Sequence, residues 1–253
     1  GVTAKDLILS IIGDHGMSGA LYQVLEFGGT AIDMMSVEER SVLTNMCAEI
    51  GAKTGIVAGD EVTSRYLAER GVDVGVGPQS DDDAQYSTIW RYDASSIGPV
   101  VARPNRHDDV VPVAEVGNAP VTRAYIGACT GAKHSDLVMA AAVLKGRSVA
   151  PGVLLQVAPA SQDALDRAVR DGTASILIEA GAHILSTGCG ACPGIGSGVL
   201  GPGEICISTT SRNSRGRMGS PDASVYLGSA YSVAAAAVAG EIVDPREMIG
   251  ATS

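Results

Sequence analysis

The fold is decided by residues 121–144, which read VTRAYIGACTGAKHSDLVMAAAVL. The run from Ala124 to Cys129 is short and apolar, which is typical of a buried strand, and Ser135 to Leu144 has the length and spacing of a helix. Strands that alternate with helices predict an α/β fold with a parallel sheet and right-handed crossovers. The same alternation continues with a strand at 153–158, a helix at 161–172, a strand at 205–208 and a helix at 232–239.

A smaller α/β unit is expected before residue 60. Thr3 with Asp6 has the spacing of an N-cap and its third helical residue. Ser36 with Glu39 repeats that spacing and predicts the start of a second helix. The expected elements are a helix over 3–12, a strand at 21–27, a helix from 36 that ends at Gly51, and a strand at 55–58.

The middle of the chain differs from both ends. Residues 71–116 contain three consecutive aspartates, several prolines and the only Trp, and they show no helical periodicity. We therefore expect an extended crossover with short strands near 99–101 and 110–113. The sequence predicts an α/β domain at 1–75, a crossover at 76–118 and a second α/β domain at 119–253.

Composition limits the classes of function. The 253 residues carry a net charge of −10 and no dense run of Lys or Arg, which argues against a nucleic-acid partner. No apolar run approaches the roughly 20 residues of a membrane-spanning helix, so we expect no membrane association of that kind. The cysteine count of five is odd, which excludes complete pairing into disulfides and favours the reducing cytoplasm.

Three of the cysteines have a chemical pattern. Cys129 follows a predicted strand, and Cys189 and Cys192 form a C-x-x-C in a glycine-rich loop. Three thiolates suit a four-iron cluster in which one iron keeps no protein ligand and can act on a substrate. The spacing alone leaves zinc binding, a redox dithiol or a structural role open. Cys47 and Cys206 lie on apolar faces and are expected to be buried.

Two arginines could serve the same site. Arg212 and Arg217 follow the strand at 205–208, and their forked donors suit carboxylates, although many arginines are only surface cations. The carboxyl ends of parallel strands share one edge of a sheet, so Cys129 and these arginines should be neighbours. Glu26, a lone acid at a strand end, is either a site residue or a solvated surface group. The pattern predicts Lewis-acid chemistry on a small di- or tricarboxylate.

Three motifs together carry a resemblance to a known family. Residues 127–131 read GACTG, residues 188–192 read GCGAC, and residues 211–217 read SRNSRGR. The chain resembles the aconitase superfamily, in the archaeal-type branch of isopropylmalate and homoaconitate isomerase large subunits. In that family the first motif is GSCTN and the third is NRNFxGR, so Gly131 and Ser211 each replace an asparagine. Residues 3–6, 45–46 and 49–52 are further stretches similar to the family.

The resemblance implies stacked three-layer α/β domains with largely parallel sheets, and a 4Fe-4S cluster. It implies reversible dehydration that moves a hydroxyl to the neighbouring carbon of a substrate such as isopropylmalate or homoaconitate. By position, the resemblance implies that Cys129, Cys189 and Cys192 are the cluster ligands. It implies that Glu26 is an active-site glutamate and that Arg212 and Arg217 bind the substrate carboxylate.

The similarity begins at the family's second domain. The chain does not begin with Met and enters its first helix at once, which indicates the interior of a longer protein. The expected partners are therefore a first domain of the same large subunit and a small subunit that carries the family's swivelling domain. A non-catalytic iron–sulfur or metal-binding module, acting as a sensor or scaffold, is the alternative function.

Overall fold

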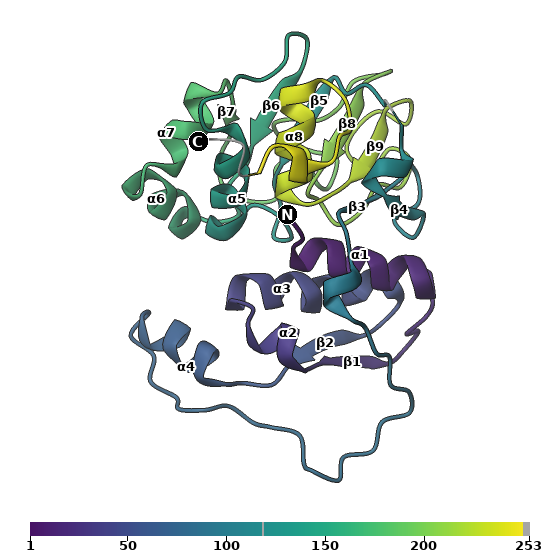
Figure 1. Cartoon of the computed structure of the whole chain (residues 1–253), viewed down its shortest axis with the longest axis vertical. Coiled ribbons are helices and arrows are strands. Elements are labelled where there is room, and N and C mark those ends of the chain that lie inside the picture. The colour runs from purple at the N-terminus through teal and green to yellow at the C-terminus, as the bar shows by residue number, and fades with distance from the viewer. Residues whose placement is uncertain (118, 250–253) are drawn as a thin grey trace.

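The structure is a computed structural model that describes residues 1–117 and 119–249. It contains two sheets, a small one near the N-terminus and a larger one that the rest of the chain builds (Figure 1). Among the described helices, none is long and apolar enough to cross a membrane.

The larger sheet has seven strands in the order β4-β3-β9-β8-β5-β6-β7. Strands β5 to β9 pair in parallel, and β3 pairs antiparallel with both β4 and β9, which confirms the predicted largely parallel sheet. Its strands are β3 (Val100–Ala102), β4 (Val110–Pro112), β5 (Arg123–Ile126), β6 (Leu154–Val157), β7 (His183–Ile184), β8 (Ile205–Ser208) and β9 (Ser224–Leu227).

Helices cover both faces of this sheet. On one face, Ala124 and Ile126 of β5 share a buried core with the helices that follow β5 and β9. On the other face, Tyr125 and Leu227 share a second core with residues from the N-terminal helices. The result is the three-layer arrangement that the family resemblance implies. The helices of the first face are α5 (His134–Leu144), α6 (Gln162–Arg170), α7 (Thr173–Glu179) and α8 (Ala230–Ala239).

The N-terminal part contributes the other covering layer. Strands β1 (Val24–Phe27) and β2 (Thr54–Val57) pair in parallel, and α1 and α3 lie between this small sheet and the large one (Figure 1). Both predicted capping boxes are present, at Thr3 with Asp6 and at Ser36 with Glu39. The helices here are α1 (Ala4–His15), α2 (Thr30–Asp33), α3 (Val37–Met46) and α4 (Glu61–Ala68).

Some elements differ from the sequence prediction. Helix α1 continues to His15 because Gly16, with φ 70°, ends it three residues later than the predicted Ile12. The pattern gave no signal for α4, which buries none of its residues, or for the short β9. The 3-10 helices are η1 (Cys47–Ile50), η2 (Ala94–Ser96), η3 (Val113–Glu115) and η4 (Pro245–Glu247).

The crossover segment reaches both sheets. After α4 it runs as a long extended loop around the small sheet and then returns to the large one (Figure 1). The strands expected near 99–101 and 110–113 are present as β3 and β4. The domain boundaries at 75 and 118 remain predictions.

Candidate active site

Cys129 is exposed on the loop after β5, and the end of β8 holds this loop in place. The Gly127 N–H donates to Thr209 Oγ1 at 2.9 Å, and the same hydroxyl lies 2.9 Å from Gly127 O, to which it donates. Thr130 Oγ1 donates to Thr209 O at 3.0 Å. Ala128 has φ 68°, which is costly for a residue with a side chain, so these bonds keep the backbone in a conformation it does not prefer.

Cys189 and Cys192 lie on a second loop that packs against β5. The Ala191 N–H donates to the hydroxyl of Tyr125 at 2.9 Å, and Tyr125 is only 1% exposed. Cys189 is exposed, whereas Cys192 is 8% exposed. Burial raises the pKa of the Tyr125 phenol, so the hydroxyl keeps its proton at neutral pH.

Lys5 joins α1 to the same region. Its ammonium donates to Thr209 O at 2.9 Å and to Thr210 O at 2.7 Å, directly before the arginine loop at 211–217. Burial lowers the pKa of Lys5 to about 7, against the opposing effect of the nearby Asp136 and Glu49 carboxylates. The backbone that leads to the arginines is therefore tied to a fully buried amine.

Arg212 contacts a buried acid from the N-terminal part. Its Nε donates to Glu49 Oε2 at 2.6 Å, and Glu49 is 5% exposed. His107 Nε2 lies 2.9 Å from Glu49 O, which fixes the backbone of that acid. One turn earlier, Asn45 Nδ2 donates to Cys129 Sγ at 3.3 Å. Residues at the end of α3 and in η1 thus contact both the arginine loop and the first cysteine.

Arg217 lies where the arginine loop meets the second cysteine loop. A Cβ built on Gly194 would lie 2.9 Å from Arg217 O, so the two backbones are in close contact. Asn213 stabilises the arginine loop, because its side-chain amide donates to Arg103 O at 2.6 Å and to Val225 O at 3.0 Å. The buried Arg217 Nε has no hydrogen-bond partner among the described residues, which leaves a donor for a ligand.

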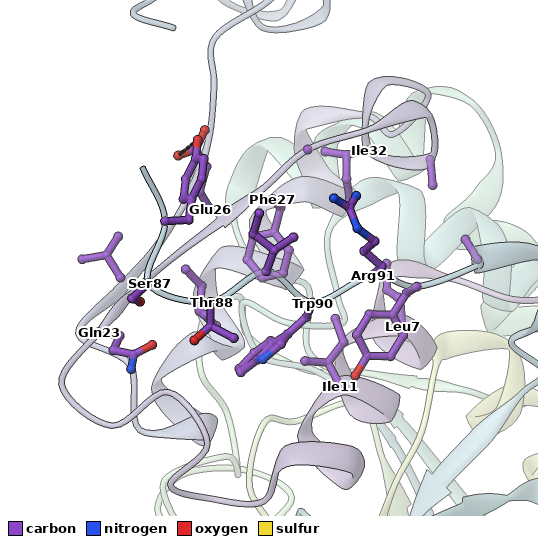
Figure 2. A pocket seen from close by; sticks show the side chains of 18 residues that line it. Leu7, Ile11, Gln23, Glu26, Phe27, Ile32, Ser87, Thr88, Trp90 and Arg91 are labelled. Carbon is purple, nitrogen blue, oxygen red and sulfur yellow. Dashed lines mark hydrogen bonds between the residues drawn. The ribbon is translucent and has the colours of Figure 1, made fainter. Parts of the chain in front are cut away.

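Glu26 lies elsewhere. It is exposed on β1, where Ser80 Oγ donates to it at 2.6 Å and Tyr86 OH at 3.1 Å. It lines a cavity of about 390 Å³ between β1, α1 and residues 86–94, whose other walls include Phe27 and Trp90 (Figure 2). None of its hydrogen bonds within the described residues reaches the three cysteines or the two arginines.

The remaining thiols are buried as expected. Burial raises the pKa of Cys47 to about 12 and raises that of Cys206 above its usual range, so both stay protonated. None of the five cysteines forms a disulfide. In the described part of the chain, no three His, Cys, Asp or Glu side chains are close enough together to hold a single metal ion.

The structure therefore brings together the two cysteine loops and the arginine loop, and it places Glu26 apart from them. Sequence reasoning assigned no role to Glu49, Asn45 or Lys5. The available signal was that all three lie in stretches shared with the family, namely 3–6, 45–46 and 49–52.

Comparison with known proteins gives the family of the chain. A family model described as the aconitase family (aconitate hydratase) matches residues 1–120 and 114–240. The chain belongs to the aconitase family.

Several members of the aconitase family are close relatives. A protein named 3-isopropylmalate dehydratase large subunit 2, from Archaeoglobus fulgidus, is 46% identical over 250 residues, which is 98% of this chain and 60% of that protein. A probable methanogen homoaconitase large subunit from Methanosarcina mazei is 46% identical over 247 residues, 98% of this chain and 62% of its own length. A 3-isopropylmalate dehydratase large subunit 1 from Pyrococcus furiosus is 44% identical over 250 residues, with 59% of its length covered. The chain spans about three fifths of the length of these relatives.

Proposed function

We propose that the protein is the cluster-bearing part of a hydro-lyase that moves a hydroxyl between adjacent carbons of a hydroxy-di- or tricarboxylate. The observation that carries this proposal is the meeting of two cysteine loops with Arg212 and its buried partner Glu49. The names of the relatives, isopropylmalate dehydratase and homoaconitase, support substrates of that class.

The thiols fit a 4Fe-4S cluster. All three are free, Cys129 and Cys189 are exposed, and both loops are anchored to β5 and its neighbour. A four-iron cluster is wider than one ion, so its ligands need not lie close enough to share a single ion. Cys129, Cys189 and Cys192 would hold the cluster, and when bound it supplies a Lewis acid at an iron that no side chain ligates.

The two arginines bind the substrate carboxylate. The Glu49 carboxylate accepts a hydrogen bond from Arg212 Nε and so orients the guanidinium. The two terminal nitrogens of Arg212 have no partner among the described residues. These nitrogens can grip one carboxylate through two parallel hydrogen bonds. Arg217 adds a donor from its unpartnered Nε. The pair stabilises the negative charge that grows on the carboxylate when the neighbouring proton leaves.

Glu49 is the acid that the geometry favours for proton transfer. Its carboxylate is buried, and Arg212 holds only one of its oxygens, Oε2. The second oxygen can carry a proton to or from the migrating hydroxyl. We therefore propose that Glu49 has the role that the resemblance gives to Glu26, whose hydrogen bonds go to Ser80 and Tyr86.

A further domain and a second subunit would complete the site. The relatives are longer than this chain, and their names call them large subunits. We propose that a further domain and a small swivelling subunit supply the base that removes the proton beside the carboxylate.

The test is a dehydratase assay on the large subunit joined to its small subunit. Formation of the unsaturated acid is followed by its ultraviolet absorption, with isopropylmalate and homocitrate as separate substrates. Turnover that requires iron and sulfide, with one of the two substrates preferred, supports the proposal. A fully active preparation without iron would contradict it.

A further inference from the structure

Tyr125 is a large side chain in the middle of the strand that leads to the first cysteine. Its neighbours Ala124 and Ile126 point into the core formed with α5 and α8, so Tyr125 points to the opposite face of the sheet. The ring is 1% exposed. Cys129 lies four residues after Tyr125, in the loop that follows β5.

The hydroxyl of Tyr125 ends at the second cysteine loop. It accepts a hydrogen bond from the Ala191 N–H at 2.9 Å and lies 3.5 Å from Cys189 O, to which its own proton is directed. Cys189 O also accepts from the Cys192 N–H at 3.1 Å, which closes the turn between the two thiols. The tyrosine therefore contacts the backbone on both sides of Gly190.

The glycines around this hydroxyl reflect the space that it occupies. A Cβ built on Gly190 would lie closer than 3.0 Å to the Tyr125 oxygen, and one built on Gly127 would be equally close to the ring. Gly190 also has φ 53°, a conformation that other residues rarely adopt. Replacing the phenol by an unsubstituted ring would leave the buried Ala191 N–H without its acceptor.

We propose that the Tyr125 hydroxyl is a positioning group that holds the loop of Cys189 and Cys192 in its ligand-presenting conformation. One strand then positions all three thiols, because β5 leads directly into the loop of Cys129 and contacts the other loop through Tyr125. The inference rests on the proposed function, since the thiols matter only if they hold a cluster.

The test compares Tyr125→Phe with Tyr226→Phe. Tyr226 lies on β9 of the same sheet, is partly buried, and its hydroxyl has no hydrogen-bond partner in the described residues. Hydrogen exchange of the 188–194 amides is measured first, on the metal-free chain. Loss of one buried hydrogen bond should speed exchange at Ala191 about fivefold or more in Tyr125→Phe and leave it unchanged in Tyr226→Phe. Thermal unfolding of both variants shows that they fold.

The second readout is release of iron from the reconstituted protein to a chelator. The rate should rise about fivefold or more in Tyr125→Phe alone. An unchanged exchange rate at Ala191 overturns the inference, whatever the cluster does. Faster exchange with unchanged iron release also overturns it, because the loop would then not depend on the hydroxyl for holding metal. An unmodified chain that takes up no iron contradicts the proposed function itself, and this is seen before any variant is compared.

Discussion

Arg212 Nε donates to Glu49 Oε2 at 2.6 Å, although the two residues lie 163 positions apart in the sequence. Glu49 is 5% exposed, while the Arg212 side chain is 42% exposed, so a buried carboxylate orients a guanidinium that solvent can still reach. This contact joins the η1 helix of the N-terminal part to the loop after β8. The substrate site that we propose is therefore formed jointly by η1 of the N-terminal part and the loops of the larger sheet.

Glu49→Gln should lower kcat/KM by about 100-fold or more in the assembled large and small subunits, because the amide keeps the shape but carries no proton for transfer. Steady-state kinetics with saturating iron measure this. Glu61→Gln, an exposed acid at the start of α4, is the control and should change kcat/KM less than twofold.

The same assay compares the two candidate acids. Glu26→Gln removes a charge that Ser80 and Tyr86 contact, outside the arginine loop. We expect it to cost less than Glu49→Gln. A larger loss for Glu26→Gln would restore the assignment that the family resemblance gives.

Arg212→Lys keeps the positive charge and loses the planar fork. A lysine cannot hold Glu49 and a substrate carboxylate together with the geometry of a guanidinium. We expect a loss of roughly 2–4 kcal/mol in transition-state stabilisation, or about 30- to 1000-fold in kcat/KM. Unchanged turnover and substrate affinity in the assembled enzyme would remove Arg212 from the active site.

The sequence predicted the larger sheet well because its strands and helices alternate and each buries a continuous apolar face. The helix predicted over 135–144 is found as α5, whereas the strand predicted over 124–129 ends at Ile126, three residues early. Helix α4 was not predicted because it buries no residue and therefore has no apolar face in the sequence. Its N-terminal end is held by tertiary contacts, such as the ion pair between Arg40 and the capping residue Asp60. Short strands without a local pattern, such as β9, form only because a neighbour pairs with them.

The candidate site was predictable where it depended on spacing and not where it depended on contact. The cysteines and arginines follow strand ends, so topology placed their loops at one edge. Glu49 lies in a 3-10 helix, and only the three-dimensional structure shows which strand end it meets. Glu26 follows the strand-end rule too, but its strand belongs to the other sheet.

Gly131→Ala tests why a glycine stands where the family has an asparagine. A Cβ at this position would lie closer than 3.0 Å to the Thr209 side chain, which bridges the Gly127 backbone. We expect the free energy of unfolding to fall by about 1–3 kcal/mol, as overpacking does in a tight core. Chemical denaturation measures it. Gly98→Ala, with no atom within 4 Å of its Cβ, should change it by less than about 0.5 kcal/mol.

Asp6 should make stability fall as pH rises. The carboxyl is fully buried at the start of α1, and burial raises its pKa to about 6 from 3.8. Between these two values the folded state binds a proton that the unfolded state has lost. The contribution of Asp6 to the free energy of unfolding is therefore fully present below about pH 4 and is lost as pH rises through 6. The complete loss is about 3 kcal/mol.

Unfolding in urea at pH 4 and at pH 6.5 measures this dependence in the unmodified chain and in Asp6→Asn. Other titrating groups affect both proteins alike, and Lys5, with its pKa near 7, is mostly charged throughout this window. Because part of the effect lies below pH 4, the unmodified chain should lose about 2 kcal/mol more than the variant between these two pH values. Equal losses would show that the pKa of Asp6 in the folded protein is not raised above its usual value.

The cysteine assignment makes the sharpest prediction. After anaerobic reconstitution with iron and sulfide, the chain should bind about four irons and four sulfides. Cys129→Ser, Cys189→Ser and Cys192→Ser should each abolish this binding, because each removes one of only three thiolate ligands. Cys47→Ser and Cys206→Ser are matched controls, since both thiols are buried and protonated, and both variants should bind iron as the unmodified chain does.

Air should remove one iron first, because the iron without a protein ligand is held least, and ferrous iron with reductant should restore it. Stoichiometric zinc binding without iron–sulfur absorption would instead identify a zinc site, and a cluster that keeps all its iron in air would point to a fourth ligand.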